Sequence, residues 1–165
     1  MKFMFKTLMA IIFFIFTSNA FADNRVEEEA DFTKFEDTFN ETTHKLNLDY
    51  KVTAAKCVTD DIYYCSYHIG NDSILLTKGQ KYSKIAASVT VVNGDKNKFL
   101  LLALSVAFII DPSLSTDEVM QIIKGTVLPV TKTQTNKAEV TFNGFKYWAT
   151  AQGEKVFFYN IILSE

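Results

Sequence analysis

The 165-residue chain contains few of the residues that interrupt or crosslink a fold: two prolines, six glycines and two cysteines. So few turn-forming residues, with no low-complexity tract after residue 22, exclude a linker-rich or disordered protein. Only two histidines are present, His44 and His68, neither repeats a ligand spacing, and a structural zinc site would need further Cys or His partners at short range. The composition therefore predicts a compact domain with an apolar core.

Short catalytic motifs are also missing. The sequence has no Gly-x-Ser-x-Gly turn and no glycine-rich phosphate loop. Ser66 precedes His68 by two residues, which would place both on one face of a strand, but such pairs are common in ordinary sheets. The 19 acidic residues are scattered mostly over turns and helix starts, so no pair of catalytic carboxylates stands out. We expect no catalytic residue and no cofactor, and the sequence favours a binding protein over an enzyme.

The only apolar run at the start of the chain is too short to cross a bilayer, which takes about 20 residues. A basic start, Met1–Lys6, precedes the apolar segment Thr7–Thr17, and Ser18–Ala22 ends in Ala-x-Ala. This layout predicts a secretory signal peptide cleaved after Ala22, with an uncleaved membrane anchor as the alternative. Residues 23–165 then form one domain, periplasmic or secreted and without a permanent membrane anchor.

No excess of basic charge is present. The chain has 17 Lys and Arg against 19 Asp and Glu, and removal of the two signal-peptide lysines changes the formal charge from −2 to −4. Nucleic-acid-binding domains usually carry a basic surface, so we expect no nucleic-acid partner. A possible partner is another envelope or secreted protein.

Both cysteines lie in one short segment, Lys56–Cys65, eight positions apart. In an exported protein an even number of cysteines predicts a disulfide, and a redox motif would need Cys-x-x-Cys spacing instead. If Cys57 faces Cys65 across an antiparallel pair, the hairpin loop is the three residues Asp60–Ile62. Val58 then faces Tyr64, and Thr59 faces Tyr63.

Periodicity predicts an α+β fold in the order α-ββββ-αα-βββ, a single-domain antiparallel sheet packed on helices. Phenylalanines at steps of three and four predict a helix over residues 31–47, and an apolar run predicts a helix over 99–110. Ser115 and Glu118 form a capping box before a helix over 116–124. Turn residues separate the predicted strands 52–59, 62–69, 73–77, 82–92, 138–142, 145–150 and 156–163.

The acidic hairpin is the first candidate site. Its tip combines two carboxylates with amphipathic aromatic side chains, which often anchor interfaces. We interpret the chain as an exported binding, inhibitor or immunity-type protein whose candidate contact residues are Asp60, Asp61, Ile62, Tyr63, Tyr64 and Tyr67. A purely structural hairpin is the alternative. A metal site that joins Asp72 to the hairpin is disfavoured, because successive turns of a meander alternate between opposite ends of a sheet.

An aromatic sheet face is the second candidate site, suited to a small ligand, a lipid or envelope assembly. Tyr147 and Trp148 are adjacent in a predicted strand, so one of them must face the core and the other must face outward. An outward Trp148 would support such a face, whereas an inward Trp148 would be ordinary packing.

Overall fold

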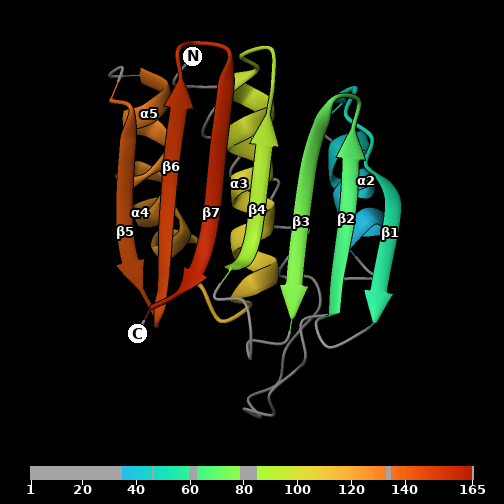
Figure 1. The fold of residues 1–165 in the computed structure, drawn as a ribbon, viewed down its shortest axis with the longest axis horizontal. Coiled ribbons are helices and arrows are strands. Elements are labelled where there is room, and N and C mark those ends of the chain that lie inside the picture. The colour runs from blue at the N-terminus through green and yellow to red at the C-terminus, as the bar shows by residue number, and fades with distance from the viewer. Residues whose placement is uncertain (1–34, 46, 60–62, 79–84, 133–134, 165) are drawn as a thin grey trace.

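Seven strands form one antiparallel sheet in the order β1-β2-β3-β4-β7-β6-β5 (Figure 1). The computed structural model describes residues 35–45, 47–59, 63–78, 85–132 and 135–164, so the predicted signal peptide lies outside the described residues. The strands are β1 Thr53–Thr59, β2 Tyr63–Ile69, β3 Asp72–Lys78, β4 Ile85–Val91, β5 Lys137–Phe142, β6 Phe145–Gln152 and β7 Val156–Leu163. The α+β class and the element order predicted from the sequence are confirmed.

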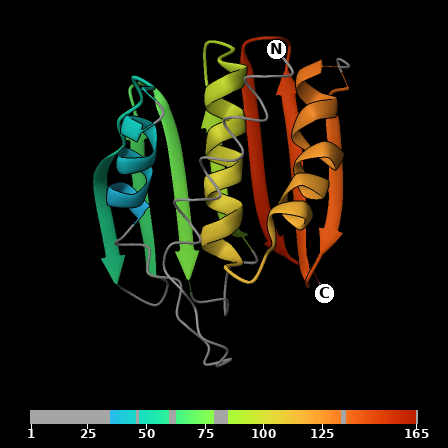
Figure 2. The ribbon, with the colours of Figure 1, turned by 180° about the vertical axis from the view of Figure 1, so that it is seen from behind.

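All the described helices cover the same face of this sheet (Figure 2). They are α2 Phe35–Lys45, α3 Lys96–Ile110, α4 Thr116–Gly125 and α5 Val127–Lys132. Helix α3 contacts the central strands β4 and β7, while α4 and α5 contact β5. Helix α2 covers the other end of the sheet, where the ring of Phe35 meets Tyr67 of β2 edge-on at 4.9 Å between centroids. The opposite face of the sheet has no helix on it in the described part of the chain.

Helix α3 forms the centre of the core. Its residues 99–107 are all buried, as expected for a helix that is apolar on every side. It begins three residues before the predicted start, because Asp95 caps it and accepts a hydrogen bond from the amide of Lys98 at 2.9 Å. No described helix is both long enough and apolar enough to span a membrane.

A cluster of polar side chains fixes α3 to the sheet. The ammonium of Lys98 donates to buried Asp72, at the start of β3, over 2.6 Å, and the other oxygen of Asp72 accepts from the amide of Val92. The hydroxyl of Tyr50 donates to Asp95 at 3.0 Å. Burial and this carboxylate raise the pKa of Tyr50 to about 12. Three separate segments of chain are therefore held together at the first turn of α3.

The capping box predicted for α4 is present, with the Ser115 and Glu118 side chains bonded to each other's backbone amides. Helix α5 was not predicted, because it is only six residues long and contains Pro129. Proline fits here because the amides of a first helical turn have no partner within the helix.

Candidate functional site

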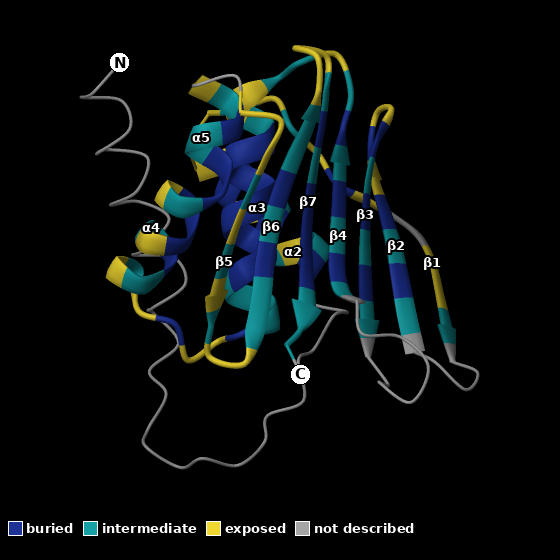
Figure 3. Cartoon of the chain, turned by 60° about the vertical axis from the view of Figure 1, so that its left-hand side comes forward, coloured by how far each residue is buried: buried dark blue, intermediate teal, exposed yellow. Residues whose placement is uncertain are grey.

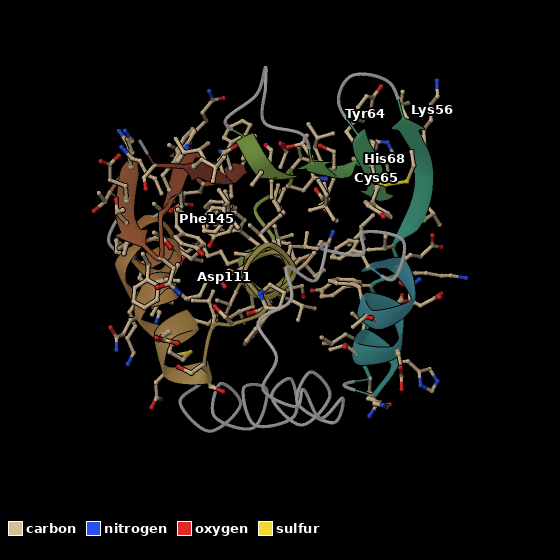
Figure 4. All side chains as sticks on the ribbon, turned by 90° about the horizontal axis from the view of Figure 1, so that it is seen from below. Lys56, Tyr64, Cys65, His68, Asp111 and Phe145 are labelled. Carbon is tan, nitrogen blue, oxygen red and sulfur yellow. A yellow bond between two sulfur atoms is a disulfide. The ribbon has the colours of Figure 1, made fainter. Side chains whose placement is uncertain are left out.

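The β1–β2 hairpin has the predicted geometry. Cys57 and Cys65 form a disulfide with their Cα atoms 4.1 Å apart. The register also pairs Val58 with Tyr64 and Thr59 with Tyr63, as predicted. Cys65 is fully buried, so the bond lies on the helix-covered side, whereas Lys56 and Tyr64 lie on the opposite side (Figure 4). Such a bond is typical of proteins outside the cytoplasm.

Two of the candidate hairpin residues, Tyr64 and Tyr67, have side chains that the structure describes, and these two lie on opposite faces of the sheet. Asp60, Asp61 and Ile62 lie outside the described residues, as does the side chain of Tyr63. Tyr67 is only 2% exposed and packs on Phe35, so its selection as a contact residue was wrong: its strand position points it into the core. Tyr64 is half-buried on the face without helices. The role of the acidic tip therefore stays a prediction.

Burial alternates along the strands, which separates two faces of the sheet (Figure 3). Tyr147 is fully buried against the helices, so the adjacent Trp148 points away from them and is half-buried. The side without helices is called the open face. Its principal residues are Lys56, Val58, Tyr64, Ser66, His68, Ser73, Leu75, Thr77, Ser88, Thr90, Phe158, Asn160, Ile162, Lys146, Trp148, Thr150, Lys137, Glu139 and Thr141.

Strand register places one continuous row of side chains across the middle of the open face. From β2 to β6 the paired residues are Ser66, Leu75, Ser88, Asn160 and Trp148. Neighbouring strands are about 4.8 Å apart, so the four steps of this row span roughly 19 Å. A parallel row two residues along contains His68, Ser73, Thr90, Phe158 and Thr150. Both rows thus mix apolar and polar groups across a broad surface.

Asn160 is the unusual residue of this face. It is only 8% exposed, and its side-chain amide makes no hydrogen bond with any other described residue. An amide can donate twice and accept twice, and the polar atoms of this one keep contact with solvent, unlike the buried hydroxyls of Tyr147 and Tyr159, so they are available at the open face. Its neighbours across the strand pairs are Ser88 on one side and Trp148 on the other. The centre of the face therefore holds an unused polar group next to an indole.

Among the described residues of the open face, charge is confined to the two ends. Lys56 lies at the β1–β2 end, whereas Lys137 and Lys146 bond Glu139 at 3.0 and 2.9 Å at the β5–β6 end. These two lysines lower the pKa of Glu139, and Lys137 also lies 5.8 Å from the centroid of the Trp148 ring. The open-face positions of β3, β4 and β7 are all uncharged. A ligand at the centre would meet hydroxyl, amide, aromatic and aliphatic groups, none of them charged.

The described residues do not form the catalytic or metal sites considered from the sequence. Ser66 and His68 share the open face, but no hydrogen bond joins their side chains. Asp72 is 2% exposed and already bonded to Lys98, so it faces the core rather than a metal site at the surface. In the described ranges no group of three or more His, Cys, Asp or Glu residues could hold a metal ion.

A separate pocket of about 300 Å³ opens near the β6–β7 turn. Buried Val130 and Phe157 line it together with exposed Lys96 and Glu154. It lies on the helix side of the sheet and is distinct from the open face. Both apolar and charged residues line this pocket. Ligand binding there can therefore be compared with ligand binding on the open face.

Sequence reasoning identified Trp148 but did not identify Ser88 or Asn160 as members of a site. The alternation of side chains along β7 could have identified Asn160. Phe157 and Tyr159 point into the core, so Asn160 must point to the opposite face. Comparisons with protein-family models, with curated proteins and with solved structures find no match for this chain.

Proposed function

We propose that this chain is a non-catalytic binding protein, active outside the cytoplasm, that holds an uncharged ligand on the open face of its sheet. The observation that supports this best is Asn160, whose amide has no partner among the described residues, keeps contact with solvent and lies beside the outward-facing Trp148. A few convergent polar groups next to an aromatic ring are the usual composition of a ligand site, and this amide can both donate to a ligand and accept from it.

The residue types of the open face support binding rather than chemistry. The hydroxyls of Ser66, Ser88 and Thr90 make no side-chain hydrogen bond with the described protein and are available to a ligand. Aromatic and polar groups set on strands are held in fixed positions, which lowers the cost of ordering a site. No described pair of side chains on this face has the geometry of a nucleophile and its base.

Export is the setting in which this function is proposed. The signal-peptide pattern and the Cys57–Cys65 bond both favour a protein that works outside the cytoplasm. The inhibitor interpretation, which depends on Asp60 and Asp61, stays a separate prediction and needs a protein partner rather than a small ligand.

The test is fragment binding observed on the isotope-labelled protein by NMR. A library of neutral, acidic and basic fragments is added, and the amide and side-chain shifts of each residue are followed. We expect the shift changes to cluster at Ser88, Trp148 and Asn160, because binding hot spots collect fragments. A cluster at Val130 and Phe157 instead, or scattered changes without a cluster, would overturn the proposal.

A matched pair of variants checks the result. Trp148→Ala removes the outward ring, and Gln121→Ala changes an exposed residue of α4 on the other side of the molecule. Loss of the cluster in the first variant and its retention in the second support the open face.

A further inference from the structure

We infer that the ligand of the open face is a neutral glycan, a short chain of uncharged pyranose sugars that lies across the strands from Trp148 toward Ser66. This inference rests on the proposed function and specifies its ligand. Such a ligand offers two kinds of surface, the C–H faces of its rings and its many hydroxyls, and the open face offers a complement to each.

The aromatic part of the site is on β6 and β7. Trp148 pairs with Asn160, and Phe158 pairs with Thr150, so the two rings are diagonal neighbours on the same face. Diagonal neighbours in an antiparallel pair are about 7–8 Å apart, within reach of aromatic side chains. Two rings on the same face at this spacing offer apolar surfaces on which the C–H faces of one or two sugars can pack.

The hydrogen-bonding part continues the same row. Asn160 lies between Ser88 and Trp148, and its amide offers both donors and acceptors. A sugar hydroxyl also both donates and accepts, so it can satisfy this amide without either group becoming charged. Ser88, Leu75 and Ser66 extend the row by three more strands, which gives a track of roughly 19 Å for a chain ligand.

Other occupants fit the open face less well. An acyl chain would leave the hydroxyls and the Asn160 amide buried without partners, which is costly. A second copy of the sheet would bury those same groups together with Lys56 and Lys146 at the ends. An anionic polymer would find no cation at the open-face positions of β3, β4 and β7, and the lysines beside Trp148, Lys137 and Lys146, are already bonded to Glu139. A neutral polyhydroxyl chain incurs none of these costs.

The experiment is titration calorimetry on the full exported chain with its disulfide intact, together with the emission of its single tryptophan. The probes are neutral hexasaccharides of β-1,4-linked glucose and of β-1,4-linked N-acetylglucosamine, with a galacturonate hexasaccharide and palmitate for comparison. We expect saturable binding of at least one neutral hexasaccharide and a shift in Trp148 emission. The dissociation constant should rise about tenfold or more in Trp148→Ala and in Asn160→Ala.

Gln121→Ala serves as the control and should keep the parent affinity, while Trp148→Phe should restore part of the binding that Trp148→Ala loses. The glycan assignment is overturned when neither neutral sugar binds, when both variants bind as tightly as the parent, or when galacturonate or palmitate binds more tightly. A dimer in sedimentation that Trp148→Ala dissociates would also overturn it. If the NMR fragments still cluster on the open face, only the ligand class is wrong, and if they do not, the proposed function fails as well.

Discussion

Tyr147 and Tyr159 project from β6 and β7 into the core, where neither hydroxyl has a hydrogen-bond partner in the part of the chain that is described. Burial raises the pKa of both phenols, and the neighbouring Asp111 raises that of Tyr147 further. Their rings contribute apolar packing, while their oxygens are an uncompensated cost. At the scale of single residues these phenols differ from Tyr50, whose hydroxyl is bonded to Asp95.

The first prediction follows from this difference. Tyr159→Phe removes an oxygen without a partner and keeps the ring, so the free energy of unfolding should stay constant or rise by up to about 1 kcal/mol. Tyr50→Phe removes a bonded oxygen and should lower it by about 1 kcal/mol. Urea denaturation of the two variants measures both changes. A clear loss of stability in Tyr159→Phe would show that its hydroxyl does have a partner.

High pH should unfold the protein through the same tyrosines. The pKa of Tyr50 is about 12 in the folded protein, and those of Tyr147 and Tyr159 are also raised, against an ordinary value of 10.0. A raised pKa contributes stability that is complete below the unfolded value and is lost as pH rises toward the folded value. The contribution of these tyrosines to stability should therefore be constant up to about pH 10 and fall above it. Comparison of tyrosinate absorbance in the parent and in Tyr147→Phe/Tyr159→Phe, followed together with circular dichroism, isolates these two phenols from the others among the seven tyrosines of the chain. Their share of the absorbance should appear only as the fold is lost, and its appearance before unfolding would contradict the assignment.

Helix α4 and strand β5 approach closely at Gly125. A Cβ built on Gly125 would lie 2.3 Å from a methyl of Val140, so the helix can pack on the strand only because this position has no side chain. In an exposed helix the change from glycine to alanine normally stabilises by about 1 kcal/mol. At this contact between α4 and β5, the same change is expected to lower the stability instead, because the added methyl would overpack the space beside Val140.

The third prediction concerns this contact. Gly125→Ala should lower the free energy of unfolding by about 1–3 kcal/mol, the usual cost of an extra buried methyl. The double variant Gly125→Ala/Val140→Ala should recover much of that loss, because the methyl that clashes is gone. Thermal and urea denaturation of the single and double variants measure the coupling. If Gly125→Ala lowers the free energy of unfolding by the same amount in the parent and in Val140→Ala, the clash is not the cause.

Sequence patterns predicted most elements because the signals lay within the elements themselves. Ser115 and Glu118 define the start of α4, and the run 99–110 identifies α3. The six-residue α5 is too short to show a helical period. The sequence of α4 shows which of its sides is apolar, but not which residues that side packs against. The register of β1 and β2 was predictable because two cysteines fix it. Asn160 was not, because its role depends on which sheet face the helices cover.

At the scale of the whole molecule, the disulfide crosslinks only two strands of a seven-stranded sheet. The loop that it closes has a sequence separation of 8, and the bond joins the edge strand β1 to β2. Cys57→Ser/Cys65→Ser should therefore cost about 2.5 kcal/mol by the chain-entropy relation, without loss of the fold. Denaturation under oxidising and reducing conditions measures the difference. Complete unfolding of the variant at room temperature would show that the hairpin is needed for the fold itself.

Strand β7 lies between β4 and β6, although it follows both in the chain. Without it, β1–β4 and β5–β6 are two separate ribbons with exposed edges, because no other described strand pair connects them. Contacts between residues so far apart in sequence form slowly. A chain that has not yet been made as far as Val156 cannot complete its sheet, so it stays open for as long as synthesis continues. Closure of the sheet is therefore tied to the appearance of its last strand in the chain, β7.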